Sequence, residues 1–343
     1  MTKQNLEPRR EKILELIIDN YITTAAPISS RAISRRLRSS LSSATIRNVM
    51  ADLEDAGMIT HPHTSAGRTP TDEGYRYYVN TLMQIKLLTE EEKKRIDKRF
   101  KQKTEEINDL LINTSRLLSS VGEEAGLVTF PALERGTFRH IELMEIAEDE
   151  ILAVLLTRSG LIKNVVVKFD KPLKKGDLAK ITNFLNVRFN GVSLHDIKKA
   201  ITQQLLIEKD SFFYILNETK RIVDLMLSNI KDERIYLEGA SKIIMQPEFN
   251  NLGKVEALLK VLESPDTLAS IARKNINTDG VSIYIGEEIQ INELCDCSLV
   301  VCDYAIKSNR SGTLGIIGPK RMPYAKIVSL VDYVSKSLSG VLE

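Results

Sequence analysis

Residues 42–60 read SSATIRNVMADLEDAGMIT. Apolar side chains recur in this stretch at helical spacing and predict a helix with one buried face, formed by Ile46, Val49, Met50 and Leu53. Ser42 or Ser43 can cap its first turn, and Gly57 lies where a left-handed C-cap is expected. The next residues, 58–60, predict a short strand. The stretch therefore predicts a helix, a tight turn and a strand in succession.

The flanking residues extend this pattern in both directions. Pro8 lies in the first turn of a predicted helix, and Ser29 can cap a short second helix after the break at Pro27. Downstream, the loop 61–70 contains glycine and proline, and Thr71 can cap a further helix. Helix, short helix, turn, helix, strand and basic loop is the order of a winged helix-turn-helix. The sequence predicts such a domain, with the loop as its wing.

The charge distribution in this region is uneven. The whole chain has a formal net charge of only +2, whereas residues 20–51 contain no acidic residue and five arginines: Arg31, Arg35, Arg36, Arg38 and Arg47. Clustered arginines around a helix-turn-helix favour contact with DNA phosphates, because counterion release drives such binding. Arg35, Arg36 and Arg38 can be backbone contacts or ordinary surface charge, and the sequence leaves both open.

The predicted third helix carries the candidate base-reading residues. Its DNA-facing positions lie off the apolar stripe, at Ser42, Ser43, Ala44, Thr45, Arg47 and Asn48. Arginine can pair with guanine and asparagine with adenine in the major groove, so Arg47 and Asn48 are predicted to read bases. The serines and the threonine are expected at phosphates or the first bases. The alternative is an amphipathic helix of a winged-helix domain that binds protein.

The predicted wing supplies a second set of contacts. Its candidate DNA-binding residues are His61, His63, Thr64, Ser65, Gly67 and Arg68. Arg68 follows a glycine and can approach the DNA backbone closely or enter the minor groove of the DNA. Two nearby histidines can also bind a metal, but no carboxylate or cysteine accompanies them. Hydrogen bonding within the loop or to phosphate is therefore the preferred interpretation, and no metal site is predicted.

The remainder of the chain has a mixed pattern. Residues 84–121 are strongly charged but keep an apolar helical stripe, which predicts one or two connecting helices. Three predicted strands follow at 140–147, 151–157 and 162–169, separated by turn signals that favour consecutive antiparallel pairing. They precede three predicted helices: 178–189, 194–206 and 212–228. After 231, strands are predicted at 234–238, 281–285, 298–304 and 313–317, and helices at 252–262, 267–274 and 325–342. The predicted fold class is therefore multi-domain α+β.

Four motifs in the sequence resemble the HrcA family. Residues 42–54 are similar to its recognition helix, and 62–76 to its wing and the helix after it; 246–249 and 318–324 also resemble HrcA segments. The resemblance implies a winged-helix DNA-binding domain and a GAF-like α/β domain that is split by an inserted dimerisation domain. The implied domains are 1–83 (winged helix), 84–134 (linker helix and first GAF-like part), 135–230 (insert) and 231–343 (second GAF-like part).

The resemblance also implies a function. Members of the family are repressors of heat-shock operons such as groE and dnaK, and they bind the inverted repeat CIRCE as homodimers. The chaperonin GroEL assists folding of the active repressor, so heat that occupies GroEL relieves repression. Two-fold protein symmetry suits an inverted repeat, because each protomer supplies one recognition helix.

Other functional classes find little support in the sequence. No apolar run reaches 18 residues and the first ten residues lack a signal-peptide core, so a cytoplasmic protein without a membrane partner is expected. Cys295, Cys297 and Cys302 are predicted to be reduced, at least some of them packed in a strand; a zinc site would need a fourth ligand. The glycines of 312–320 fit no known phosphate loop. We expect no enzyme activity and no cofactor.

Two alternatives of other classes remain. The first is a winged-helix regulator controlled by a small-molecule effector in the GAF-like domain, which rests on fold analogy alone. The second is an enzyme with a winged-helix accessory domain, for which no catalytic residues are identifiable. Ligand-dependent melting would favour the effector hypothesis.

Overall fold

We describe a computed structural model of the chain. The described residues are 6–37, 41–62, 67–100, 107–129, 137–158, 162–169, 176–207, 212–228, 235–264, 267–268, 270–271, 280–306 and 310–342. The chain forms two compact units, each taken by itself here. The first comprises 1–129, 235–303 and 313–338, and the second comprises 130–234, 304–312 and 339–343.

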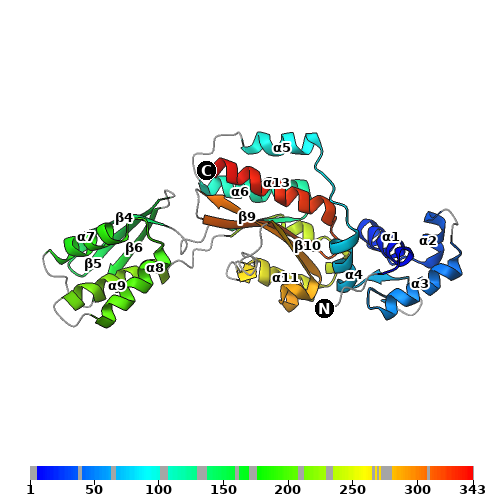
Figure 1. Ribbon diagram of the computed structural model, residues 1–343, viewed down its shortest axis with the longest axis horizontal. Helices are drawn as coiled ribbons and strands as arrows, with labels where there is room; N and C mark the ends of the chain where they lie inside the picture. Colours follow the sequence, from blue (N-terminus) through cyan, green and yellow to red (C-terminus); the bar gives the residue numbers. More distant parts are fainter. Residues whose placement is uncertain are drawn as a thin grey trace. The chain divides into compact units, whose positions relative to one another are not determined.

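The first unit begins with a small helical module, residues 6–82, called the N-terminal module below (Figure 1). Its elements are α1 (Pro8–Thr24), α2 (Ser30–Arg36), α3 (Ser43–Asp55), β1 (Ile59–Thr60), β2 (Thr69–Pro70), α4 (Asp72–Tyr77) and a π-helical turn (Tyr78–Leu82). The order predicted from the sequence is confirmed. Ser29 caps α2, Ser42 caps α3 and Thr71 caps α4, and Gly57 has a φ of 73° after α3.

The core of the N-terminal module is formed by the predicted apolar stripes. Ile46 and Leu53 of α3 are fully buried, together with Ile13, Ile17 and Ile33 from α1 and α2. The two short strands pair antiparallel, with Ile59 opposite Pro70 and Thr60 opposite Thr69. Apolar burial on one face of each helix therefore leaves the opposite face of α3 at the surface.

The rest of the first unit, called the central domain below, is built on a five-stranded sheet of order β7-β3-β10-β9-β8. Its strands are β3 (Ala125–Thr129), β7 (Ile235–Glu238), β8 (Val281–Ile285), β9 (Cys297–Ile306) and β10 (Arg310–Pro319). Strand β3 pairs antiparallel with both β7 and β10, and β8 pairs antiparallel with β9. The sequence pattern predicted the last four strands but missed β3, which lies inside the sheet.

Helices cover both faces of this sheet (Figure 1). One face carries α6 (Ile107–Gly122) and α13 (Tyr324–Leu342); the other carries α10 (Ala240–Ile244) and α11 (Leu252–Leu262). Helix α6 packs against β3 so closely that a Cβ on Gly126 would lie 2.3 Å from the carbonyl oxygen of Ser115. Only glycine permits this approach.

A connecting segment links the N-terminal module to α6. Residues 83–89 lead to α5 (Glu90–Phe100), so the predicted helical stripe of 84–121 forms two helices, α5 and α6. The segment lies along α13: the Lys86 amide donates to the carbonyl of Ala325 at 3.2 Å. The Tyr333 hydroxyl donates to Asp97 at 2.9 Å. These bonds tie the connection to the central domain.

The second unit contains a three-stranded antiparallel sheet of order β4-β5-β6 and three helices. These are β4 (Phe138–Ala147), β5 (Glu150–Thr157), β6 (Ile162–Lys168), α7 (Asp177–Phe189), α8 (Leu194–Ile207) and α9 (Phe212–Ser228). The predicted strands, helices and antiparallel pairing are confirmed. The inner face of the sheet, including Ala153 and Val167, packs into one core with the helices. The chain as a whole is therefore mixed α+β with antiparallel sheets, as predicted.

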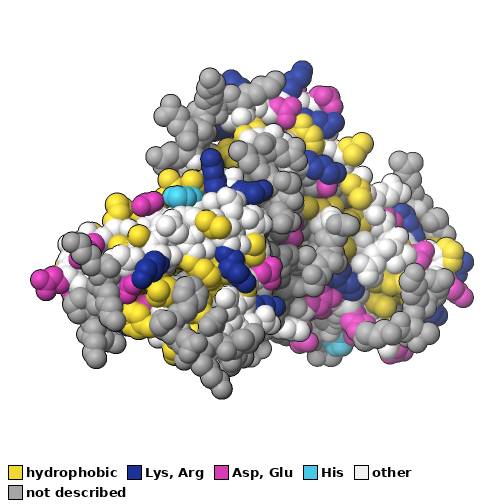
Figure 2. All heavy atoms as spheres, turned by 60° about the vertical axis from the view of Figure 1, so that its left-hand side comes forward, with side chains coloured by type: hydrophobic (Ala, Val, Ile, Leu, Met, Phe, Trp, Pro, Cys, Tyr) yellow, Lys and Arg dark blue, Asp and Glu magenta, His cyan; other side chains and the backbone are white. Residues whose placement is uncertain are grey.

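The outer face of that sheet carries apolar side chains. Met144, Leu152 and Val166 are register partners across the three strands, and Met144 and Val166 are exposed. Ile162 at the start of β6 is exposed as well. Figure 2, in which the second unit comes forward, shows apolar side chains at its surface between charged ones.

Candidate nucleic-acid interface

Side-chain hydroxyl groups at the start of α3 stabilise its first turn. Ser42 Oγ accepts from the Thr45 amide at 3.1 Å and lies 2.8 Å from Thr45 Oγ1. Ser43 Oγ lies 3.0 Å from Ser30 Oγ, which joins α3 to α2. The three hydroxyl groups predicted to meet phosphates or bases are thus already used to fix the start of the helix and its angle to α2.

Arg47 and Asn48 occupy the exposed side of the same helix. Both side chains are exposed, as is Ala44 one turn earlier. Within the described part of the chain, neither Arg47 nor Asn48 makes a side-chain hydrogen bond or ion pair. A guanidinium and an amide that have no partner among the described residues, on a helix with a capped first turn, suit binding to another molecule.

Two of the three acidic residues in the second half of α3 are paired with neighbours. Asp52 pairs with Arg10 of α1 at 2.9 Å. Glu54 pairs with Arg68 at 2.7 Å and hydrogen-bonds His61. Burial raises the pKa of Glu54, but the His61 hydrogen bond and the Arg68 charge outweigh it and hold the pKa below the ordinary value. This pairing reduces the repulsion that α3 would otherwise exert on phosphates.

The base of the predicted wing is fixed to the loop before α2. Ile28 and Arg68 exchange two backbone hydrogen bonds, of 3.0 and 2.9 Å. Gly67 lies so close to this loop that a Cβ would come within 2.5 Å of the Ile28 carbonyl oxygen. Glycine at 67 is therefore required for the wing to reach this position.

The predicted wing residues have different positions. His61 and Arg68 both turn toward Glu54, so their side chains link the wing to α3 in this structure. His63, Thr64 and Ser65 lie outside the described residues. Sequence reasoning treated His61 and Arg68 as DNA contacts and did not anticipate Glu54 as their partner. The only signal was the acidic residue at the end of the recognition helix.

The arginines of α2 add positive charge beside α3. Arg31, Arg35 and Arg36 are exposed, and Arg38 lies outside the described residues. Arg31 and Arg35 have no ion pair in the part of the chain that the structure describes. Exposed arginines without an ion pair among the described residues, next to the exposed side of α3, form a surface that suits phosphate binding.

Comparison with known proteins decides the family. A family model described as the HrcA protein C terminal domain matches residues 108–328. The chain belongs to the HrcA family. A Heat-inducible transcription repressor HrcA from Geobacter sulfurreducens is 37% identical over 99% of both chains. One from Desulforamulus reducens is 34% identical over 98% of this chain and 97% of its own. The HrcA resemblance drawn from sequence motifs is therefore confirmed.

A solved structure also resembles the whole chain. The crystal structure of a hypothetical protein matches with a TM-score of 0.58 and 23% identity, covering 98% of this chain and 99% of its own. This similarity concerns the fold. Because the HrcA relatives match over nearly the full length, the family assignment includes the N-terminal module, which the family model does not reach.

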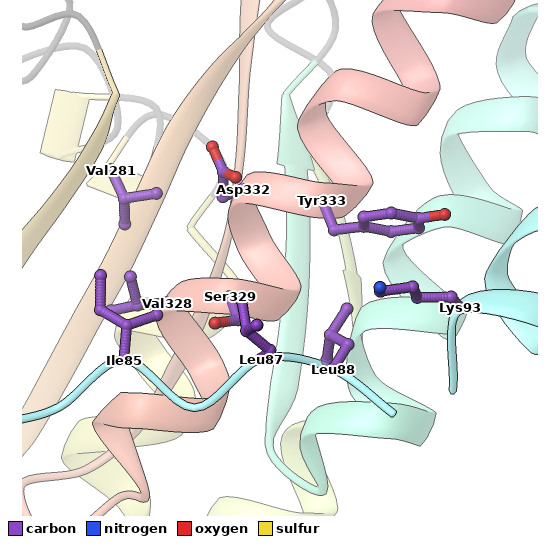
Figure 3. A pocket seen from close by; sticks show the side chains of 9 residues that line it. All are labelled: Ile85, Leu87, Leu88, Lys93, Val281, Val328, Ser329, Asp332 and Tyr333. Atoms are coloured by element: carbon purple, nitrogen blue, oxygen red, sulfur yellow. The ribbon is translucent and has the colours of Figure 1, made fainter. Parts of the chain in front are cut away.

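The central domain of this HrcA-family chain contains a cavity that could admit a small ligand. It has a volume of about 450 Å³ and lies between residues 85–88 and α13 (Figure 3). Its walls are mostly apolar, and Ile85 and Leu87 face Val328 and Ser329 across it.

The charged and phenolic groups at the rim of this cavity are already paired. Lys93 binds Glu90, Tyr333 donates to Asp97, and Asp332 binds Lys336. A ligand in the cavity would therefore compete with existing partners for these polar groups.

The three cysteines are free thiols. Cys297 and Cys302 are buried in β9 as predicted, and Cys295 is exposed just before it. Within the described ranges, no group of three His, Cys, Asp or Glu side chains could hold a metal ion. No helix in those ranges has the length and apolar character needed to cross a bilayer.

Proposed function

We propose that this protein is a heat-inducible transcription repressor that binds DNA through α3 of its N-terminal module. Its curated relatives are named as heat-inducible transcription repressors of the HrcA family. The observation that carries the DNA-binding assignment is the exposure of Arg47 and Asn48 on a capped helix beside exposed arginines. A repressor needs a surface of this kind and no catalytic residues.

The mode of recognition follows from the helix geometry. In a winged helix-turn-helix, the N-terminal part of the recognition helix enters the major groove. Arg47 pairs there with guanine and Asn48 with adenine or a neighbouring base, because these side chains match the base edges. The small side chain of Ala44 lets α3 come close to the base edges in the major groove. Arg31 and Arg35 contact phosphates on either side of the groove and supply most of the salt-dependent affinity.

In this proposal the wing side chains change partners when DNA binds. Arg68 and His61 bind Glu54 without DNA. A phosphate close to the wing competes with the Glu54 carboxylate for the Arg68 guanidinium, since both anions offer two oxygens that arginine can bind together. His63, Thr64 and Ser65 belong to the proposed wing through the sequence resemblance alone.

The domain layout proposed here follows the family. The N-terminal module is the winged helix-turn-helix (1–83), and the central domain is the GAF-like domain in two parts, 84–134 and 231–343. Its sheet combines β3, which precedes the second unit in sequence, with β7 to β10, which follow it. The inserted segment, 135–230, is the proposed dimerisation domain.

The outer face of the β4-β5-β6 sheet supports a homodimer. Met144, Leu152 and Val166 form an apolar row across it, and burial of such a row against a second copy removes it from water. A two-fold dimer presents two α3 helices to the two halves of an inverted repeat. We propose the CIRCE repeat upstream of chaperone operons as that target, and GroEL as the chaperonin that assists folding, on the strength of the family resemblance.

A binding measurement tests this function. The protein is titrated into a duplex carrying CIRCE and into a scrambled duplex of equal length at physiological salt, with and without GroEL. We expect at least a 10³-fold preference for CIRCE, which is the usual lower range for specific DNA binders. We also expect a larger active fraction when GroEL is present. Equal affinity for both duplexes, from protein shown to be folded, contradicts the proposal.

A further inference from the structure

Three motifs that DNA binding does not use meet within the first compact unit. They are 71–76 at the start of α4, 246–249 after α10, and 318–324 between β10 and α13. The first belongs to the N-terminal module and the other two to the central domain. Their charged and aromatic side chains contact one another directly.

Asp72 is the centre of the first contact. Its carboxylate binds Lys320 Nζ at 2.6 Å through Oδ1 and accepts from the Glu287 amide at 3.2 Å through Oδ2. Gly286 lies beside it with a φ of 55°, and a Cβ there would come within 1.8 Å of Asp72 Oδ2. Two separate segments of the central domain are therefore shaped around this one carboxylate.

Arg76 makes the second contact, one turn further along α4. Its guanidinium binds Glu288 through two nitrogens, with Nε at 2.8 Å from Oε1. It also donates to the Ile283 carbonyl of β8 at 2.7 Å. Because the Arg76 guanidinium is planar and binds Glu288 through two nitrogens and a backbone carbonyl as well, these bonds fix the orientation of α4 relative to β8 in addition to their separation.

Arg321 makes the third contact, with residues 246–248 and with α1. It binds Glu248 and Gln246 and reaches the Ile22 carbonyl of α1 at 3.4 Å. Its side chain is only 14% exposed. An aromatic contact accompanies these polar ones: Tyr324 lies against Tyr75 with ring centroids 6.0 Å apart.

We propose that these residues form a clamp that sets the orientation of the DNA-binding module and thereby the half-site spacing that the repressor accepts. The clamp residues are Asp72, Tyr75, Arg76, Gln246, Glu248, Glu288, Lys320, Arg321 and Tyr324. This inference rests on the proposed function. Lys320 and Arg321 are both bound by carboxylates of the clamp, Asp72 and Glu248, and act as positioning residues.

The physical reason is the short connection between module and domain. Residues 83–89 have no regular structure, so without the clamp the module could rotate on this tether. In a dimer, two N-terminal modules that are loosely held can bind half-sites at several spacings. Two modules held in a fixed orientation can bind half-sites at one spacing only. Each exposed ion pair contributes little stability alone, and the buried tyrosine pair supplies most of the packing. In this proposal the ion pairs determine which orientation the N-terminal module adopts on the central domain.

The first test measures spacing selectivity. Wild type, the double variant Arg76→Ala/Lys320→Ala and the control Lys336→Ala are titrated with a CIRCE duplex and with one lengthened by two base pairs between the half-sites. Lys336 forms an exposed pair with Asp332 on α13, away from the clamp residues. We expect the affinity ratio between the two duplexes to fall by about tenfold in the double variant and to stay unchanged in the control. An unchanged ratio in the double variant overturns the proposal, whereas general unfolding would weaken both duplexes together.

The second test needs no DNA. Trypsin can cut after Lys86, which is exposed in the connecting segment but held by the Ala325 carbonyl. Loss of the clamp frees this segment, so we expect several-fold faster cleavage there in the double variant and wild-type rates in Lys336→Ala. Equal cleavage rates in all three proteins overturn the clamp. If wild type shows no preference for CIRCE, the proposed function fails, and the cleavage rates still decide whether the clamp exists.

Discussion

Tyr324 and Tyr75 are equally buried, each 1% exposed, but only one of their hydroxyl groups is hydrogen-bonded among the described residues. Tyr324 Oη lies 2.6 Å from Ser298 Oγ and donates to the Lys320 carbonyl at 2.7 Å. The Tyr75 hydroxyl has no partner in those residues. Burial raises the pKa of both phenols, so both remain protonated.

The two tyrosines should respond differently to loss of the hydroxyl. Tyr324→Phe leaves buried Ser298 and a carbonyl without their partner, and we expect a loss of about 1–3 kcal/mol in the free energy of unfolding. Tyr75→Phe removes an unsatisfied group and should be neutral or slightly stabilising. Urea unfolding of both variants measures the difference. Equal losses would show that the Tyr75 hydroxyl has a partner.

Glu124 predicts a pH dependence of stability. This carboxyl is 6% exposed, and burial raises its pKa to about 8, against the lowering effect of Arg321. In the unfolded chain the pKa is near 4.3, so between these values the folded state holds a proton that the unfolded state has released. The contribution of Glu124 is therefore fully present below about pH 4 and is lost as pH rises through about 8.

Glu124→Gln keeps the neutral shape and should remove this dependence. We expect the variant to gain stability over wild type at pH 8.5 and to gain less at pH 5.5, where only part of the Glu124 contribution has been lost. Thermal unfolding midpoints at the two pH values measure the effect. A variant that is less stable by the same amount at both would show that the carboxylate is charged and paired in the folded protein.

Substitution of Gly67 and of Gly57 by alanine gives a matched comparison within the N-terminal module. Gly67→Ala inserts a Cβ against the Ile28 carbonyl, so we expect displacement of the wing and weaker binding to specific and scrambled duplexes alike. Gly57→Ala meets open space and changes only the left-handed backbone, at about 1–2 kcal/mol of stability. DNA titrations and urea unfolding of both variants separate the two effects. Normal DNA affinity in folded Gly67→Ala would exclude a role for the wing position.

The outer sheet face predicts the dimer interface. Val166→Glu places a charge in the apolar row of that face, whereas Val187→Glu changes an 85% exposed side chain on α7. We expect Val166→Glu to weaken dimerisation by at least tenfold, because the carboxylate would lose water on association. Sedimentation equilibrium compares the two proteins. A Val166→Glu dimer as tight as that of Val187→Glu would place the interface elsewhere.

Local signals in the sequence predicted much of the fold and of the recognition helix. The spacing of Ile46, Val49, Met50 and Leu53 located α3, and the serine before it predicted the cap. Strand β3 was missed because Ala125–Thr129 is a short apolar run without alternation, directly after a helix. Its place inside the sheet depends on partners more than 100 residues away in sequence.

The pairing of site residues could not be predicted in the same way. Residue type and position marked Arg68 and His61 as candidate DNA contacts, and nothing in the sequence indicated partners for Lys320 and Arg321. Glu54, Asp72 and Glu248 become their partners only through tertiary contacts. Residue type and spacing identify candidates, but the folded chain determines which charges remain unpaired for DNA.

The role of α3 in reading bases is the central claim, and one comparison tests it most directly. Arg47→Ala and the control Arg95→Ala, which removes an exposed arginine on α5, are each titrated with CIRCE and scrambled duplexes. We predict that Arg47→Ala lowers the specific-to-nonspecific affinity ratio by an amount equivalent to about 1–3 kcal/mol and relaxes the preference at one base pair, while Arg95→Ala leaves the ratio unchanged. An unchanged ratio in Arg47→Ala would contradict base reading by this helix position.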